Sequence, residues 1–182
     1  MFWKRKKTRV NYIDFLNEVL ETGREEGYIM SKETPYIPEL LAQSNDVCLK
    51  IIKGIAKENE GRSYSSQQLH LSLGWCIYAG IGSTYHWHID WNSLKYKGLY
   101  ETLIAERGIF AMDEYVLDAV GIEFESPQGK DLTTHIMDIA AKCICAILDK
   151  TNKNPSIEDL LEAHKAMFIY GMVIQMNRLG MR

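Results

Sequence analysis

The sequence has few of the residues that favour β-sheets and few of those that interrupt helices. Its 182 residues include only four prolines, and Val and Thr are scarce beside Leu, Ile, Met, Lys and Glu. β-branched side chains prefer the pleated surface of a sheet, whereas unbranched side chains lose little freedom in a helix. The composition therefore predicts a mostly helical fold, and the length suits one domain with a substantial core.

Several patterns that define whole classes of protein are also missing. No run of about 18 apolar residues is present, so we expect no membrane span. The opening MFWKRKK is followed by polar TRVNYID, where a secretory signal peptide needs an apolar core. The motifs G-x-x-x-x-G-K-[ST] and G-x-S-x-G do not occur, which leaves phosphate-loop and serine-hydrolase functions without support. We expect a cytoplasmic protein that needs no cofactor.

The cysteines form no C-x-x-C pair. All four of them, Cys48, Cys76, Cys143 and Cys145, lie inside apolar segments. In a chain without an expected export signal, this placement predicts reduced thiols that are mostly buried.

Positive charge is concentrated at the N-terminus. The formal net charge is −3, and the first nine residues, MFWKRKKTR, contain five positive charges, so the rest of the chain carries −8. We expect residues 1–9 to form a basic tail that lies in solvent or touches an anionic surface. The net negative charge of the remainder argues against nucleic acid as the main partner.

Apolar residues recur at intervals of three and four along most of the chain, which predicts amphipathic helices. Ser65 and Gln68 match a capping box, and Ser156 is the expected cap of the last helix. The expected helices span residues 8–21, 38–61, 65–82, 94–106, 110–120, 131–149 and 156–179, with a turn-containing and partly extended connector after 120. The sequence predicts an all-α fold, a single-domain bundle of about six or seven helices over residues 10–182.

Two histidines fall on or beside the apolar stripes of the last two expected helices, His135 and His164. Either could face a ligand or a metal inside a bundle. We expect both to be core residues with hydrogen-bond partners, which is the usual state of a buried histidine.

The stretch STYHWHIDW, residues 83–91, places His86, His88 and Asp90 at alternate positions. On a strand, alternate residues share one face, so the three side chains would converge on one metal ion. On a helix each residue turns by about 100°, so His86 and Asp90 are neighbours while His88 points away. The helical neighbours of this stretch favour the helix. We therefore expect no metal here, and we expect Asp90 to cap a helix nearby.

The alternative is an extended segment, because residues 69–75 alternate between large apolar and smaller or polar side chains. The stretch would then resemble the first metal-binding motif of the metallo-β-lactamase superfamily, H-x-H-x-D-H. This resemblance implies a strand-rich αβ/βα sandwich and a metal-dependent hydrolase with His86, His88 and Asp90 as ligands. Trp91 stands where that family has its last histidine, which removes a ligand of the second metal.

Glycines and aromatic residues mark the same part of the chain. If it is helical, Gly74, Gly80 and Gly82 allow close packing against another helix. Tyr and Trp are favoured where one end of a side chain is buried and the other is wet, as at interfaces and in ligand grooves. Seven of them are candidates for an interface or a pocket: Trp75, Tyr78, Tyr85, Trp87, Trp91, Tyr96 and Tyr100.

The favoured function is that of a small interaction protein that binds a protein partner or itself through this aromatic region. A homodimer is one form that self-association could take, and a regulatory or toxin-neutralising protein would have this composition. The acidic residues between 113 and 125 could steer a basic partner towards the chain. Two alternatives remain, a metal-dependent hydrolase built on residues 86–90 and a helical bundle that binds a small ligand.

Overall fold

Helices make up all the regular secondary structure of the described residues. The computed structural model describes residues 10–34, 36–56 and 65–181. Within these ranges it contains seven α-helices, one 3-10 helix and no strand. The elements are α1 (Tyr12–Glu25), α2 (Pro38–Ala56), α3 (Ser66–Lys97), α4 (Leu99–Ile104), η2 (Ile109–Ala111), α5 (Met112–Ala119), α6 (Pro127–Lys150) and α7 (Ile157–Arg178). The all-α prediction is confirmed, whereas the expected basic tail, residues 1–9, lies outside the described residues.

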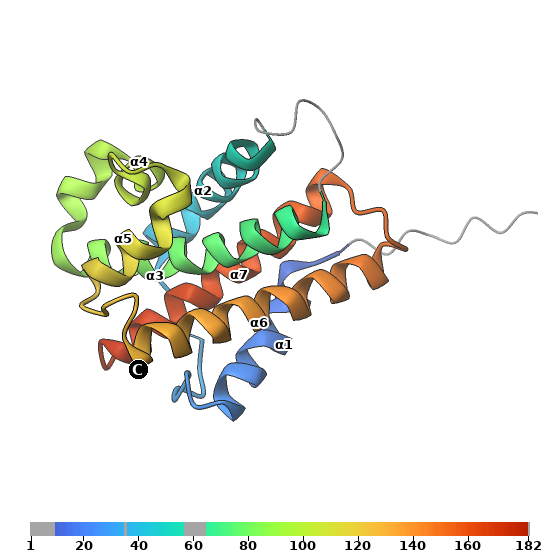
Figure 1. Ribbon diagram of the computed structural model, residues 1–182, viewed down its shortest axis with the longest axis horizontal. Coiled ribbons are helices and arrows are strands. Elements are labelled where there is room, and N and C mark those ends of the chain that lie inside the picture. The colour runs from blue at the N-terminus through green and yellow to red at the C-terminus, as the bar shows by residue number, and fades with distance from the viewer. Residues whose placement is uncertain (1–9, 35, 57–64, 182) are drawn as a thin grey trace, which may run out of the picture.

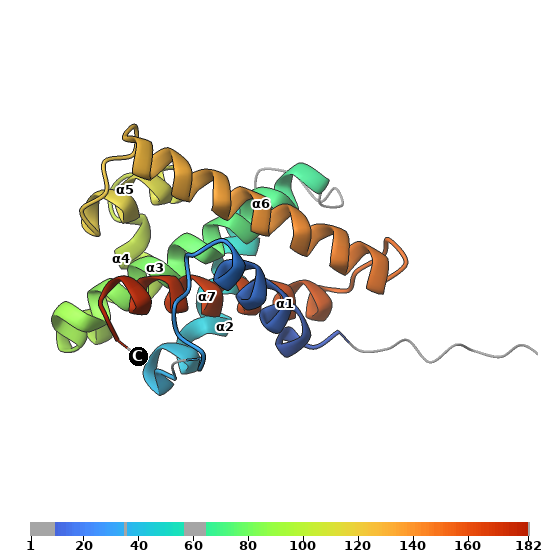
Figure 2. The ribbon, with the colours of Figure 1, turned by 90° about the horizontal axis from the view of Figure 1, so that it is seen from below.

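Two long helices, α3 and α7, form the centre of the bundle (Figure 1). Figure 2 shows α5 and α6 on one side of this pair and α1 and α2 on the other. Residues 72–84 of α3 and 166–176 of α7 are all buried. A helix that is buried on every side lies inside a protein rather than on its surface. The single apolar stripe expected for the last helix therefore describes only part of its buried surface.

Polar side chains cap the starts of four of the described helices, α1, α3, α6 and α7. Ser65 accepts a hydrogen bond from the backbone N–H of Gln68, and the Gln68 side chain accepts one from Ser65, which completes the predicted capping box of α3. Ser156 and Asp159 make the same arrangement at the start of α7. Asn11 accepts from the N–H of Ile13, so α1 begins at residue 12 rather than 8.

Other predicted boundaries are also wrong: the helix expected over 65–82 continues to Lys97, and the first helix ends at Glu25 rather than at residue 21. The sixth helix begins at Pro127, four residues earlier than expected, because Ser126 caps it and proline suits the first helical turn. The segment expected as one helix over 94–106 is the end of α3 followed by α4, separated by Gly98 at φ 82°. The connector after residue 120 contains turns and no strand among its described residues. The expected end of the second helix near residue 61 lies outside the described residues.

The backbones of α3 and α7 approach closely at two glycines. A methyl group on Gly80 would overlap the carbonyl oxygen of Phe168, and one on Gly171 would overlap the carbonyl oxygen of Ile77. Each glycine therefore faces the main chain of the other helix, where no side chain fits. The sequence predicted this role for Gly80. Gly82 faces side chains of Leu103 and Val116, from α4 and α5, in a similarly tight space.

A buried histidine joins the central helices. His164 has its Nδ1 at 2.6 Å from the carbonyl oxygen of Leu160 and its Nε2 at 2.7 Å from the hydroxyl of Ser72 on α3. Nδ1–H donates to that carbonyl, so the neutral ring leaves Nε2 to accept from Ser72. Burial lowers the pKa of His164 to about 4, although the hydrogen bond to Leu160 raises it.

A second buried histidine ties three helices together. His135 on α6 lies 2.7 Å from a carboxylate oxygen of Glu26 and 2.7 Å from the hydroxyl of Tyr170 on α7. Its ring stacks on that of Tyr28, with centroids 3.7 Å apart. Burial lowers the pKa of His135, although the bond to Glu26 opposes this. Both predicted core histidines thus have hydrogen-bond partners, as expected.

Three of the four cysteines are buried and all four are free thiols. Cys48 and Cys76 lie with their sulfurs 3.7 Å apart between α2 and α3. Burial raises the pKa of Cys143 to about 12, which keeps this thiol protonated. Cys145 is exposed because it lies two residues further along α6 and points away from the core. The prediction of mostly buried, reduced thiols is confirmed.

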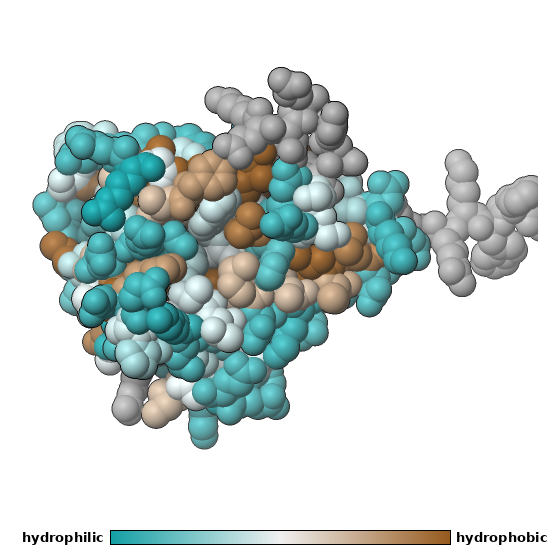
Figure 3. Space-filling view, in the orientation of Figure 1, coloured by the Kyte–Doolittle hydropathy of each residue, from teal (hydrophilic) through white to brown (hydrophobic). Residues whose placement is uncertain are grey.

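Hydrophilic residues predominate on the face shown in Figure 3, and a band of hydrophobic residues crosses its centre, over α3 and α6. In the part of the chain that the structure describes, no helix combines the length and hydropathy that a membrane crossing needs.

We predict that Gly80→Ala lowers the free energy of unfolding by about 3 kcal/mol, because the new methyl group forces two backbones apart. Urea denaturation measures the difference. Gly74→Ala is the matched control, since its Cβ would meet side chains and no backbone: the Met137 sulfur at 3.3 Å and a methyl group of Ile136 at 3.8 Å. That substitution should change stability by less than about 1 kcal/mol. Equal effects of the two substitutions would contradict the backbone contact.

The pKa of His164 also predicts how stability depends on pH. A folded pKa of about 4, below the unfolded value of 6.5, means that the unfolded chain binds the proton more readily. The stabilisation by the neutral ring is complete above about pH 6.5 and is lost as the pH falls towards 4, by about 3 kcal/mol in total.

The substitution His164→Leu should remove this pH-dependent loss, because leucine does not titrate and the Ser72 hydroxyl, released from Nε2, can donate to the Leu69 carbonyl 2.9 Å away. Chemical denaturation between pH 4 and 7.5 measures it, and His88→Gln, at an exposed position, serves as the control. An unchanged pH profile in the His164 variant would contradict the assignment.

Candidate functional site

The helix α3 is broken at Asp90. The backbone there has φ −157° and ψ 82°, outside the helical region, although helix continues on both sides. The Asp90 carboxylate accepts a hydrogen bond of 3.0 Å from the N–H of Ser93. Aspartate is among the best residues for this capping geometry, so Asp90 starts a new helical segment that ends at Gly98. The predicted role of Asp90 as a cap is confirmed.

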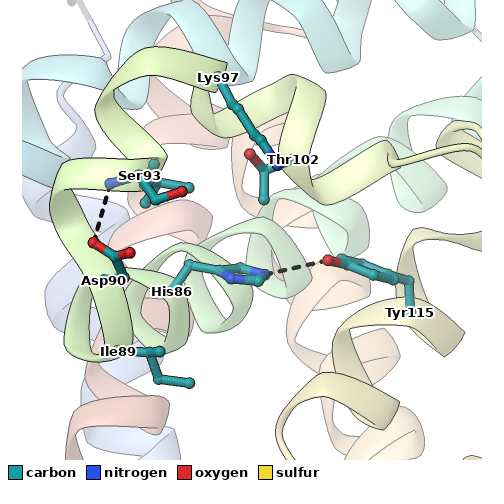
Figure 4. A pocket seen from close by; sticks show the side chains of 8 residues that line it. His86, Ile89, Asp90, Ser93, Lys97, Thr102 and Tyr115 are labelled. Atoms are coloured by element: carbon teal, nitrogen blue, oxygen red, sulfur yellow. Dashed lines mark hydrogen bonds between the residues drawn. The ribbon is translucent and has the colours of Figure 1, made fainter.

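The break opens a small polar cavity between the end of α3, α4 and α5, here called the kink pocket (Figure 4). Its volume is about 220 Å³. The lining residues are His86, Ile89, Asp90, Ser93, Leu94, Lys97, Thr102 and Tyr115. Most of these side chains are polar, which sets the cavity apart from the apolar core below it.

His86 and Tyr115 form one wall of the kink pocket. The Nε2 of His86 lies 3.5 Å from the Tyr115 hydroxyl, and the two rings are nearly parallel with centroids 6.2 Å apart. Burial lowers the pKa of His86. The ring is therefore neutral at neutral pH, with one nitrogen able to donate a hydrogen bond and the other able to accept one.

The kink pocket also contains one group of each charge. The Asp90 carboxylate and the Lys97 ammonium both line it, and Figure 4 shows Asp90 at the break and Lys97 further along α3, beyond Ser93. Among the described residues, neither forms an ion pair. The hydroxyl of Thr102 donates to the carbonyl of Gly98, so it offers only lone pairs to the cavity. The site can thus pair with a cation, an anion, or both.

The three residues of the H-x-H-x-D stretch do not meet. His86 and Asp90 line the kink pocket, whereas His88 is exposed and is not part of its lining. Within residues 10–34, 36–56 and 65–181, no three His, Cys, Asp or Glu side chains lie close enough to hold a metal ion. The extended geometry that the metallo-β-lactamase resemblance requires is absent, because residues 83–89 are helical.

The seven candidate aromatic residues are distributed from the core to the surface. Trp75 and Tyr78 are buried, Trp75 against the ring of Phe110 and Tyr78 with its hydroxyl 2.9 Å from Thr133, so neither is available to a partner. Only Tyr96 is fully exposed, at 89 %. The half-buried remainder consists of Tyr85, Trp87, Trp91 and Tyr100.

Sequence reasoning missed six residues of the kink pocket: Ile89, Ser93, Leu94, Lys97, Thr102 and Tyr115. Ser93 and Lys97 lie three and seven residues after Asp90, so their position follows once the break is known. Thr102 and Tyr115 come from other helices, and no local pattern places them there.

Comparisons with known proteins give no guide to this site. No family model, no curated protein and no solved structure matches the chain.

The cap at Asp90 leads to a direct prediction. Asp90→Ala should lower the free energy of unfolding by about 1 kcal/mol, because the N–H of Ser93 loses its acceptor. Asp90→Asn should have little effect, because asparagine caps as well as aspartate does. Urea denaturation together with exchange of the Ser93 amide proton measures both variants. Exchange that is accelerated equally by Asp90→Asn and Asp90→Ala would contradict the capping role.

Proposed function

We propose that the protein is an interaction module that associates with a second copy of itself through the kinked end of α3. The surface concerned, called here the kink surface, consists of Ile89, Asp90, Tyr96 and Lys97. The observation that carries the proposal is that exposed Ile89 lines the kink pocket beside two opposite charges that form no ion pair among the described residues, with exposed Tyr96 on the same segment of α3. Ile89 is 60 % exposed and Tyr96 is 89 % exposed.

The apolar part of the kink surface supplies contact area. Ile89 lines the mouth of the kink pocket, and Tyr96 lies three residues after Ser93, which places it next to the pocket wall. Large side chains that remain in water gain most from being covered, and tyrosine is among the residues that dominate binding energy at interfaces.

The charged part supplies complementarity. In a two-fold contact between identical chains, the same patch meets itself, so each group faces a group from the other copy. Asp90 and Lys97 have opposite charges and lack ion-pair partners among the described residues. A second copy can therefore pair Lys97 of one chain with Asp90 of the other, twice. A patch of one sign could not do this, because it would repel itself.

A second candidate is the binding of a small polar molecule in the kink pocket, supported by its volume of about 220 Å³ and its polar lining. Such a ligand would stabilise the monomer, whereas self-association makes stability depend on protein concentration. The metal-dependent hydrolase gains no support from the geometry of residues 86–90.

Sedimentation velocity over a wide range of protein concentration tests the proposal. We expect a reversible dimer in which Ile89→Ser and Tyr96→Ser each weaken association by at least about tenfold, because each removes apolar area from the contact. Ile157→Ser is the matched control, since Ile157 is also an exposed isoleucine but lies at the start of α7. A monomer at every concentration would exclude self-association, and equal weakening by the control would exclude this surface.

A charge reversal tests the pairing itself. Lys97→Glu should weaken the dimer, and the double variant Lys97→Glu/Asp90→Lys should restore part of the affinity. Lys95→Glu is the control, because Lys95 is exposed on the same turn of α3 but does not line the kink pocket. Dimerisation that is insensitive to Lys97→Glu would contradict the proposed pair.

A further inference from the structure

A second cavity lies where α7 ends, formed by elements that take no part in the kink surface. Its volume is about 210 Å³. The walls come from the chain after α1, the connector before α6, the first turns of α6 and the last turn of α7. Three features of its lining matter: an apolar floor of Ile122, Leu132 and Ile174, a cation at Arg178, and a carboxylate at Asp131.

The Arg178 guanidinium is held in place by neutral groups. It donates to the carbonyl oxygen of Val120 at 3.3 Å and to the side-chain oxygen of Gln175 at 3.0 Å. No carboxylate of the described residues forms an ion pair with it. Arginine has five N–H donors in a fixed plane, so three remain for a ligand. Its geometry matches the two oxygens of a carboxylate.

The Asp131 carboxylate, the negative group of the cavity, is also held in place by a neutral group. One of its carboxylate oxygens accepts a hydrogen bond from the Tyr28 hydroxyl. The pKa of Tyr28 is raised by burial and by the neighbouring Asp131, so this hydroxyl stays protonated and remains a donor. The Tyr28 contact leaves the other oxygen of Asp131 able to accept from a cation. Stacking on His135 fixes the Tyr28 ring, and the Tyr28 hydroxyl in turn fixes the Asp131 carboxylate.

We propose that this cavity binds a free α-amino acid with an apolar side chain. The zwitterion has a carboxylate for Arg178 and an ammonium group for Asp131, and its side chain lies on the floor of Ile122, Leu132 and Ile174. A ligand with a single charge would leave one of the two protein charges unpaired. A larger ligand would exceed a volume of about 210 Å³, which is below the usual range for drug-sized molecules.

Isothermal titration calorimetry with L-leucine as the probe tests the proposal on the full chain. We expect saturable binding to one site. Leucinamide lacks the carboxylate and N-acetyl-leucine lacks the ammonium group, so each should bind at least about tenfold more weakly, the loss expected for one charge-assisted hydrogen bond. Binding of all three compounds with equal affinity would overturn the proposal, as would the absence of leucine binding.

Variants of the protein locate the site. Arg178→Gln and Asp131→Asn should each weaken leucine binding by at least about tenfold. Lys130→Gln is the control, because Lys130 is next to Asp131 but is exposed and does not line the cavity. Tyr28→Phe keeps the stacked ring but removes the hydrogen bond that positions Asp131, so it should weaken leucine binding by less than Asp131→Asn does. Circular dichroism checks the fold of each variant. Leucine binding that survives Arg178→Gln would overturn the assignment, and the ligand series on the unaltered chain tests it independently of any folding defect.

Discussion

The contact between the backbones of α3 and α7 at Gly80 and Gly171 is the constraint on which the rest of the bundle depends. Because no side chain separates the two helices there, each is surrounded by the other and by the outer helices, and both become buried on all sides. The hydrogen bond between His164 and Ser72 lies within the same pair. The kink pocket and the cavity at the end of α7 occur where this close packing stops.

The parts of the fold that depend on neighbouring residues were predictable from the sequence. The capping boxes at Ser65 and Ser156 and the all-α class follow from local hydrogen bonding and from the spacing of apolar residues. The predicted helix boundaries were wrong where the spacing of apolar residues continues across a break between two helices. Leu94, Leu99 and Leu103 are all buried, so their pattern reads as one helix, yet Gly98 separates the end of α3 from α4. Apolar periodicity records which side is buried, and it does not record whether the backbone is continuous.

The candidate site was predictable to a smaller extent. Asp90 as a cap and the divergence of His88 from His86 follow from helix geometry alone. Thr102 and Tyr115 line the kink pocket because of how α4 and α5 pack against α3. Local sequence patterns do not specify this tertiary packing. Composition also could not separate the aromatic residues by burial. Trp75 and Tyr78 lie in the core while Tyr96, in the same stretch of sequence, is exposed, because the face of a helix changes with every residue.

The break at Asp90 also divides the molecule energetically. Helical hydrogen bonds run along α3 and make its turns cooperative, but the ladder is interrupted at Asp90 and restarts at the next segment. The last turns of α3, together with α4 and α5, are therefore joined to the central pair by side-chain packing rather than by a continuous helix. Such a unit can open at a lower free energy than global unfolding requires. The interruption thus allows the kinked end to open separately from the core, and a partner bound there would favour its ordered form.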